Sequence, residues 1–388
     1  MPVKNRFAEL QTEITEWRRD IHENPEILFE THRTSALVAE KLQSFGCDEV
    51  VTGIGRTGIV AVIKGKTDSS GKVIGLRADM DALPIMEATG LDYASKTPGA
   101  MHACGHDGHT AMLLGAAKYL AETRNFDGTA VVIFQPAEEG GGGGKEMCDD
   151  GMMERWGIQE VYGMHNWPGM PVGSFGIRAG AFFAATDQFE ITLEGRGGHA
   201  AKPHETVDTT VMAAQTVLAL QTIASRNADP VDQLVVSVTS FETSSKAFNV
   251  IPQKVQMKGT VRTMSAEMRD LAEKRINEIC NGIAATFGGT ANVNYIRGYP
   301  VMVNHQDQTE FAAEVARSVS GSCEDADLVM GGEDFAFMLE ERPGAYILVG
   351  NGEDGAMVHH PEYNFNDEAI PAGCSWWAEI VERRMPAA

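Results

Sequence analysis

Three histidines and a cysteine crowd one short segment of this sequence, MHACGHDGHT at 101–110. Cys104 and His106 are two residues apart, so in an extended segment their side chains point the same way and can reach one cation. Thiolate and imidazole are good ligands for a borderline divalent metal. His102 and His109 are further candidates. A helix N-terminus that is merely rich in polar caps is the alternative explanation.

Two adjacent carboxylates, Glu138 and Glu139, follow the apolar run TAVVIFQ at 129–135 almost directly. At the end of a strand, two such groups cannot both be buried and charged without a cation. One of them can bind a metal while the other stays available as a general base. An exposed acidic turn is the alternative.

Five glycines, 140–144, come next. They do not form a phosphate-binding P-loop, because Glu139 stands where its first glycine would be and Glu146 where its Ser or Thr would be. These glycines instead leave room for a substrate or a metal to approach the backbone.

Other histidines also follow apolar runs. VYGM at 161–164 runs into His165, and AYILVG at 345–350 is followed shortly by His359 and His360. A single histidine in such a place is more often structural than a ligand. The ligand interpretation is favoured here because several candidate groups follow strand ends, and ligand sites in open α/β sheets form outside the carboxyl ends of the strands.

Four candidate groups follow predicted strands or crossovers at that edge: Asp81, Cys104, Glu139 and His165. Together they supply enough soft and hard ligands for two metal ions about 3.5–4 Å apart. The sequence therefore predicts a two-metal site.

The elements that must position this site are short apolar runs separated by helical patterns. Runs such as VIGLR at 73–77 are continuously apolar, which is typical of strands buried on both faces. Helical patterns such as 109–124 lie between them. This alternation predicts an α/β fold in which a mostly parallel sheet carries the catalytic domain.

The pattern changes near residue 187, where DQFEITLEG alternates apolar and polar residues as a half-solvated strand does. The order of elements that follows, βαββαβ, predicts a ferredoxin-like α+β domain. We therefore expect an inserted domain at 187–298 and a discontinuous catalytic domain formed by 1–186 and 299–388.

The amino-acid composition limits the classes of partner that this protein can bind. The 388 residues include 54 acidic and 32 basic side chains, and the net charge of -22 disfavours nucleic acid and anionic membranes as partners. The N-terminal segment lacks the apolar stretch of a signal peptide, and no apolar run approaches the roughly 18 residues of a membrane span. Six scattered cysteines fit a reducing compartment. We expect a cytoplasmic protein.

Nine motifs occur along nearly the whole chain: LRADMDALP (76–84), HACGHDGH (102–109), QPAEEGGGG (135–143), GMH (163–165), GRGGHAAKPH (195–204), NVIP (249–252), GTVR (259–262), GGEDF (331–335) and HHP (359–361). Their types and order resemble the metallopeptidase family of aminoacylases, carboxypeptidase G and hippurate hydrolase. The branch most similar to this chain holds hippurate hydrolases, bacterial N-acyl-amino-acid amidohydrolases and plant auxin-conjugate hydrolases.

The resemblance implies that two divalent metal ions, Zn or Mn with Co or Ni as further candidates, are held by Cys104, His106, Glu139, His165 and His359. Within HHP the family's ligand lies two residues before the proline, which selects His359 over His360. Cys104 occupies the place of a bridging aspartate in related branches. Asp79 stands where those branches have a metal-binding histidine, and Asp81 is expected to orient a ligand.

The same resemblance implies the activity. The enzyme would cleave the amide bond of N-acyl-L-amino acids, with Glu138 as the general base. His199 would reach the site of a neighbouring subunit in a homodimer or larger even assembly. Asn249 and Arg262 would meet the substrate's carbonyl and carboxylate. Tyr299 departs from the family pattern, because carboxypeptidase G-like relatives carry a second arginine there.

Other functions remain open at this point. One is a dipeptidase or carboxypeptidase of the same family. Another is a metal-binding relative that has lost catalysis, although such a protein would not need Glu138. A third is a Cys104 nucleophile activated by His106. That mechanism would leave the carboxylates and the other histidines without roles.

Overall fold

The computed structural model describes residues 4–387 and divides into two compact units. The first unit takes the described residues up to Gly180, Val303–Asp327 and the described residues from Asp334 on, and the second takes Ala181–Met302 and Leu328–Glu333. The domain boundaries expected from the sequence, 187 and 298, both fall inside the second unit. That unit also takes a short segment that the sequence assigned to the catalytic domain.

The first unit is built on one mixed sheet with the strand order β1-β2-β4-β3-β5-β16-β6-β15. Its four central strands, β4, β3, β5 and β16, run parallel, and antiparallel pairs lie on either side of them. The strands are β1 (Glu49–Ile54), β2 (Gly58–Lys64), β3 (Val73–Asp79), β4 (Thr129–Gln135), β5 (Glu160–Trp167), β6 (Phe175–Ile177), β15 (Glu324–Asp325) and β16 (Gly344–Gly350). The α/β class expected from the continuous apolar runs is confirmed.

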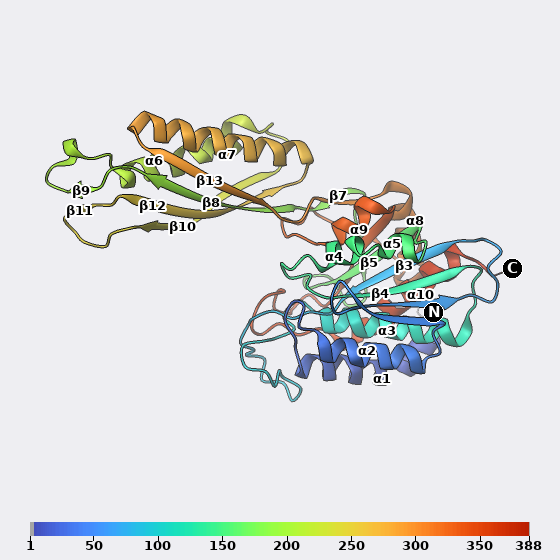
Figure 1. The fold of residues 1–388 in the computed structure, drawn as a ribbon. Coiled ribbons are helices and arrows are strands. Elements are labelled where there is room, and N and C mark those ends of the chain that lie inside the picture. Colours follow the sequence, from blue (N-terminus) through green and yellow to red (C-terminus); the bar gives the residue numbers. More distant parts are fainter. Residues whose placement is uncertain (1–3, 388) are drawn as a thin grey trace. The chain divides into compact units, whose positions relative to one another are not determined.

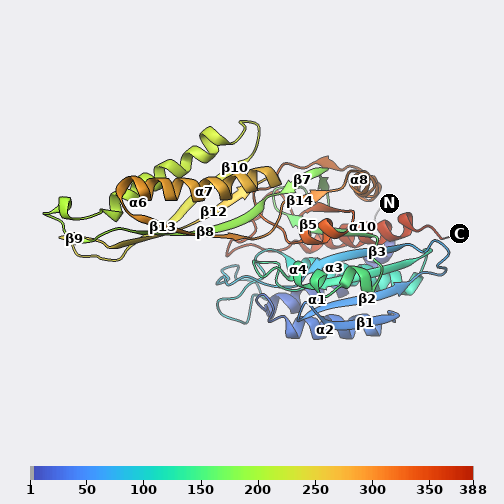
Figure 2. The same ribbon diagram turned by 45° about the horizontal axis from the view of Figure 1, so that its top comes forward.

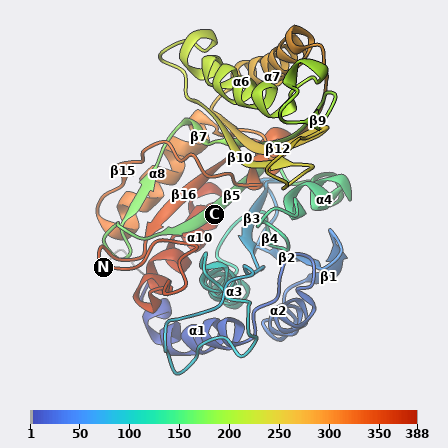
Figure 3. The same cartoon turned by 90° about the vertical axis from the view of Figure 1, so that its left-hand side faces the viewer.

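Helices cover both faces of this sheet. One layer shares a single apolar core with the strands: α1 (Asn5–Glu23), α2 (His32–Ser44), α3 (His106–Thr123), α8 (Gln306–Ser320) and α10 (Ile370–Arg384). Three shorter helices lie outside that core, with α4 on the side of the sheet away from α1–α3 (Figures 1 and 3): α4 (Gly143–Asp149), α5 (Met152–Arg155) and α9 (Phe335–Glu341).

Helix α3 lies at the centre of the first layer because its residues are small and apolar on nearly all sides. At Gly115 a Cβ would lie 2.6 Å from Ile14 Cδ1 and 2.8 Å from Cys374 Sγ, so only glycine lets α1 and α10 pack this closely against α3. The packing fixes the start of α3, which carries His106.

The second unit is a ferredoxin-like domain. Its antiparallel sheet has the order β10-β12-β8-β13, and α6 and α7 cover one face of it (Figures 1 and 2). The elements are β8 (Ala185–Glu194), α6 (Thr209–Thr222), β10 (Leu234–Thr243), β12 (Lys254–Thr263), α7 (Ala266–Phe287) and β13 (Thr290–Arg297). Phe189, Ile191 and Leu193 of β8 point into the core, as the alternation in the sequence predicts.

Short elements complete the fold: β7 (Gly180–Phe183) pairs with β14 (Met302–Asn304), and β9 (Gly198–His199) pairs with β11 (Val250–Ile251). Single turns of other helix types occur at η1 (Pro203–Glu205), η2 (Ile223–Asn227) and η3 (Asp367–Ala369). Among the helices described between residues 4 and 387, none combines the length and the apolar character needed to cross a membrane.

A buried ionic cluster ties α1 to the start of α3. His22 Nδ1 lies 2.8 Å from Asp107 Oδ2, and His22 Nε2 lies 3.3 Å from Glu87 Oε1. Arg18 lies 3.3 Å from the same Asp107 oxygen. Burial lowers the pKa of His22, but the carboxylates of Asp107 and Glu87 outweigh it and raise that pKa to about 9. Both ring nitrogens of His22 therefore donate.

We predict that this cluster stabilises the first unit at and below neutral pH and that the stabilisation is lost at higher pH. The folded pKa of His22 exceeds its unfolded value of about 6.5, so the stabilisation is complete below about pH 6.5 and is lost as the pH rises through about 9. All five tryptophans lie in the first unit, so their fluorescence during urea unfolding of metal-free protein reports on it. Between pH 6.5 and 9.5 the parent should lose on the order of 3 kcal/mol more than His22→Gln does. Parallel pH profiles for the two proteins would contradict the prediction.

Candidate metal centre

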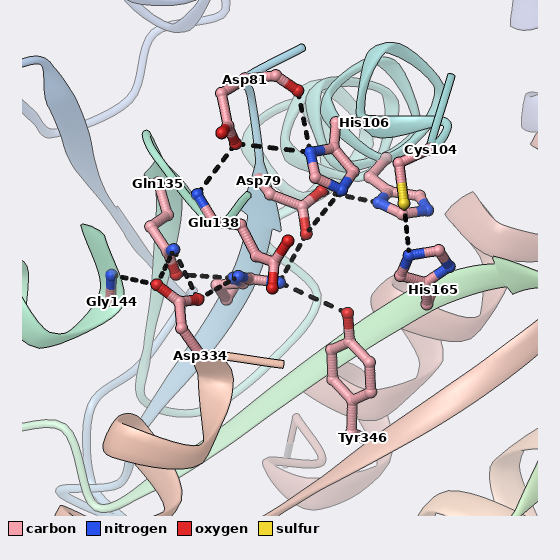
Figure 4. Close-up of polar contacts among 12 residues, drawn as sticks. Asp79, Asp81, Cys104, His106, Gln135, Glu138, Gly144, His165, Asp334 and Tyr346 are labelled. Atoms are coloured by element: carbon pink, nitrogen blue, oxygen red, sulfur yellow. Dashed lines mark hydrogen bonds and ion pairs between the residues drawn. The ribbon is translucent and has the colours of Figure 1, made fainter. Parts of the chain in front are cut away.

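The five ligands expected from the sequence come together at the carboxyl edge of the central parallel strands. His165 lies in β5, Glu139 follows β4 and His359 follows β16. Cys104 and His106 lie where the chain crosses from β3 into α3 (Figure 4). Parallel strands bring these segments to one edge although they are far apart in the sequence.

Gly105, between Cys104 and His106, makes this crossing possible. Its φ is +93°, and a Cβ there would lie 2.2 Å from Asn166 Nδ2 and 2.5 Å from the Tyr363 hydroxyl oxygen. Only glycine tolerates both the left-handed backbone and this close approach. The turn directs Cys104 and His106 into the same space.

A first group of ligand atoms is formed by Cys104, His106 and His165, all three buried. Their ligand atoms lie within 4.8 Å of one another, and Cys104 Sγ is 3.3 Å from His165 Nε2. This spacing suits one cation held by sulfur and two imidazoles.

A second group is formed by Cys104, Glu139 and His359, again with ligand atoms within 4.8 Å. Glu139 Oε1 is 3.3 Å from His359 Nε2. The backbone N–H of His359 donates to the carbonyl of Ala103 at 2.7 Å, which ties the loop after β16 to the cysteine segment. Cys104 belongs to both groups, so its sulfur atom lies close to the ligand atoms of each.

Buried His106 Nε2 has no hydrogen-bond partner among the described residues. A buried polar atom without a partner costs about 1–3 kcal/mol, and more when it is charged. His106 Nδ1 donates to the carbonyl of Asp81 at 2.9 Å, so Nε2 is the ring nitrogen that faces the cluster. His165 Nδ1 likewise donates to the Asn166 carbonyl. The donor set thus fits divalent metal ions.

The electrostatics of the metal-free cluster favour cation binding over cysteine nucleophilicity. Burial raises the pKa of the Cys104 thiol well above its usual value, and the charges of Glu139 and Glu138 raise it further. Burial lowers the pKa of His165 well below its usual value, so that imidazole stays neutral. A thiol that holds its proton this firmly is a poor nucleophile until a cation displaces the proton.

Asp79 and His109 are occupied elsewhere. The backbone N–H of Asn166 donates to His109 Nε2 at 2.9 Å, so Nδ1 carries the proton and donates to Asp79 Oδ1 at 2.6 Å. The other oxygen of Asp79 accepts from Arg77 at 2.6 Å. Both nitrogens of His109 and both oxygens of Asp79 are therefore engaged in hydrogen bonds, although their ligand atoms lie within 4.8 Å of one another and of those of His106.

Asp81 holds the backbone of the two glutamates. Its Oδ1 accepts the N–H of Glu138 at 2.9 Å, and its Oδ2 accepts the N–H of Glu139 at 3.1 Å (Figure 4 shows the first of these). Glu138 is 7% exposed, and its carboxylate lies within 4.8 Å of ligand atoms of His106 and Glu139. The general base expected from the sequence thus lies beside the ligands.

His102 and His360 do not join the cluster. No group of metal-ligating atoms among the described residues includes either of them. His102 is buried beside His22, with ring centroids 6.3 Å apart, and burial lowers its pKa to about 3. His360 is exposed, and its Nδ1 accepts the N–H of Glu362.

The residues expected to meet the substrate lie in the second unit, at two places. His199 and Asn249 are exposed near the paired strands β9 and β11, where Ala200 N–H donates to the Asn249 carbonyl. Arg262 is half-buried towards the far end of β12, where it donates to Thr260 and to the Val261 carbonyl. The structure does not bring these three side chains together within one chain.

Asn166 supports the centre although the sequence gave it no role. Its side chain donates to the Cys104 carbonyl at 2.6 Å and accepts from the Tyr363 hydroxyl at 2.6 Å. Asn166 stands next to a candidate ligand in the GMHNWP segment, and that adjacency is the signal that could have revealed it. Arg77 and Asp334 were missed as well, although both fall within quoted motifs.

Comparison with known proteins places the chain in a family. Residues 75–383 match the model of peptidase family M20/M25/M40. Hippurate hydrolase of Campylobacter jejuni is 43% identical over 97% of this chain and 97% of its own length. N-acetylcysteine deacetylase of Bacillus subtilis is 37% identical over 95% of this chain and 96% of its own length.

Solved structures agree over the whole fold. A putative aminohydrolase from methicillin-resistant Staphylococcus aureus superposes with a TM-score of 0.90 at 33% identity, covering 98% of both chains. A Bacillus subtilis protein described as a dinuclear metal-binding peptidase of the M20 family has a TM-score of 0.86 at 34% identity, covering 98% of this chain and 100% of its own. This chain therefore belongs to peptidase family M20/M25/M40.

Proposed function

We propose that this chain is a metal-dependent amidohydrolase that cleaves N-acyl-L-amino acids into a carboxylic acid and a free amino acid. The observation that carries the proposal is Glu138, a buried carboxylate beside a cluster of ligand atoms. The hippurate hydrolase and N-acetylcysteine deacetylase relatives, similar over nearly the whole chain, support the substrate class.

In the proposed mechanism, Cys104, His106, Glu139, His165 and His359 hold two divalent cations, which would polarise the acyl carbonyl and acidify a water molecule. Glu138 takes a proton from the water that attacks the acyl carbon and delivers it to the departing amine nitrogen. Asp81 fixes the backbone on which Glu138 stands, so the carboxylate approaches from a constant direction. Burial excludes bulk water from this proton transfer.

Zinc is the metal that a thiolate and imidazoles favour, and manganese, cobalt and nickel are further candidates because carboxylates and the general affinity order admit them. Six free cysteines support a reducing, cytoplasmic compartment, in which Cys104 would remain available to a metal. A dipeptidase or carboxypeptidase of the same family is the second candidate function, supported by the carboxypeptidase relatives of Saccharolobus solfataricus.

We further propose a homodimer or a larger even assembly in which His199 and Asn249 serve the partner's site. Between Lys254, next to β11, and Arg262, eight residues of an extended strand span about 26 Å. A small substrate cannot touch both ends, so Arg262 of one chain and His199 of another would complete one site. The second unit offers an edge strand, β10, with exposed Val235 and Phe241, and α6 exposes Leu218 to 65%.

We predict that Cys104→Ser lowers the metal content, because the hydroxyl is a much weaker ligand than a thiolate. Cys374→Ser is the matched control: Cys374 is also buried, and a hydroxyl can donate to the Met112 carbonyl as its thiol does. Metal analysis after dialysis checks both variants. If Cys104→Ser retains two metal ions as firmly as the parent, the thiolate is not a ligand.

We predict that Glu138→Gln keeps both metal ions and lowers kcat by at least about 10³-fold, since the amide cannot take the proton. Glu139→Gln, the same change one residue along, should instead lose metal. Kinetics and metal analysis on the same preparations separate the two. Substantial turnover by Glu138→Gln, or metal loss equal to that of Glu139→Gln, would refute the assignment of the base.

We predict that His199→Ala lowers turnover by roughly 10²–10³-fold with metals retained, the scale of one lost oxyanion donor. Mixing His199→Ala with Glu138→Gln should restore activity, because a mixed dimer has one site that lacks both groups and one intact site. Random mixing would give about a quarter of the parent's activity. Differently tagged subunits establish that exchange has occurred. No recovery after exchange would mean that His199 does not act on its partner.

A further inference from the structure

Arg77 is a fully buried cation on β3, beneath the candidate centre. Its guanidinium donates to Gln135 Oε1 at 2.8 Å, to Asp79 Oδ2 at 2.6 Å and to Asp334 Oδ1 at 2.9 Å. Arg77 therefore links the ends of β3 and β4 to Asp334, the N-cap residue that precedes α9. No proposed catalytic step uses it, yet a buried arginine with several partners is costly unless its contacts are kept.

Asp334 connects Arg77 to the glycine loop, which we define as residues 136–144. Its Oδ2 accepts the N–H of Gly144 at 2.8 Å, and both of its oxygens accept from Gln135 Nε2, at 2.8 and 2.9 Å. Gln135 stands just before the glycine loop and Gly144 is its last residue. One carboxylate thus holds both ends of the segment that carries Glu138 and Glu139.

The glycine loop is narrow, so its ends determine the place of its middle. Gly143 N–H donates to the Ala137 carbonyl at 3.1 Å, and a Cβ at Gly143 would lie only 1.8 Å from the Pro136 carbonyl oxygen. At Gly144 a Cβ would lie 2.9 Å from the Asp334 carbonyl oxygen and 3.1 Å from Gln135 Oε1. Glycine at both positions lets the chain fold back against its own start.

We propose that Arg77 and Asp334 form a buried clamp that closes the glycine loop and thereby positions Glu138 for proton transfer. Arg77 is a positioning residue that acts through Asp334. The inference rests on the proposed role of Glu138 as the base. Asp81 holds the middle of the glycine loop through the N–H groups of Glu138 and Glu139, and the clamp holds its two ends.

The clamp also balances charge. Asp79 and Asp334 are both 0% exposed, and the guanidinium lies between them. Replacing Arg77 by Lys keeps the positive charge, but a single ammonium cannot donate to three separated partners as a guanidinium fork does. Asp334→Asn keeps the volume but presents an amide donor where Gly144 N–H and Gln135 Nε2 both need an acceptor.

The first test compares amide hydrogen exchange of the metal-free parent, Arg77→Lys and Asp334→Asn. We expect faster exchange in peptides that cover 136–146, with β3 and β4 unchanged. Arg18→Lys is the matched control, since Arg18 is another fully buried arginine of the first unit, paired with Asp107 and Asp367. Exchange of 136–146 should stay at the parent's rate in this control.

The second readout is kinetic. At saturating metal both variants should retain two metal ions and a KM within about threefold of the parent, while kcat falls roughly 10- to 10²-fold, the cost of a base displaced by about 1 Å. A general loss of structure would instead accelerate exchange throughout the first unit. Gly144→Ala disturbs the contact of the glycine loop with Asp334 without changing a charge. If Arg77→Lys and Asp334→Asn do not fold, this variant tests the clamp.

Parent-like exchange of 136–146 in both Asp334→Asn and Gly144→Ala would overturn the clamp. Faster exchange there with an unchanged kcat would overturn its role in positioning Glu138. The exchange measurement needs neither metal nor substrate. If the parent hydrolysed no N-acyl amino acid at all, the proposed function would fail while the exchange data would still report on the clamp.

Discussion

Buried negative charge at the carboxyl edge of the parallel strands is the constraint around which this structure is arranged. Asp79, Asp81, Glu138 and Asp334 are each at most 7% exposed. Burial costs each such carboxylate several kcal/mol of hydration free energy, which nearby charges or hydrogen bonds must offset. Part of this cost is offset by hydrogen bonds from Arg77 and from the backbone N–H groups of Glu138, Glu139 and Gly144. The cluster around Cys104 is where bound cations would offset the rest.

The backbone at this edge is held in unfavourable conformations. Ala137 and His359 have φ values of 54° and 69°, in the left-handed region that costs a non-glycine residue about 1–2 kcal/mol. Ala137 precedes Glu138, and His359 is itself a candidate ligand. Both conformations persist because neighbouring segments determine them, through Gly143 N–H to Ala137 and His359 N–H to Ala103. The site is therefore shaped by the fold before any ligand arrives.

Much of this arrangement could be read from the sequence, because strand ends in an α/β sheet converge by rule. Periodicity alone predicted the ferredoxin-like order of the second unit. The role of Arg77 could not be read, since Gln135 and Asp334 lie 58 and 257 residues away. His109 is only a further candidate ligand in the sequence, and no motif shows that the Asn166 N–H donates to its Nε2. The separation of Arg262 from His199 depends on the direction of β12, which no motif encodes.

The order of strands in the first sheet has a consequence for synthesis on the ribosome. Strand β16 inserts between β5 and β6, yet it is translated after the second unit. Until β16 emerges from the ribosome, β5 has an unpaired edge and the loop that carries His359 is not yet beside His165. The segment from β8 to β13 is continuous and can fold earlier. A nascent chain can therefore complete the β8–β13 segment before the edge that carries His165 and His359, so the candidate metal centre is assembled only when nearly the whole chain has been translated.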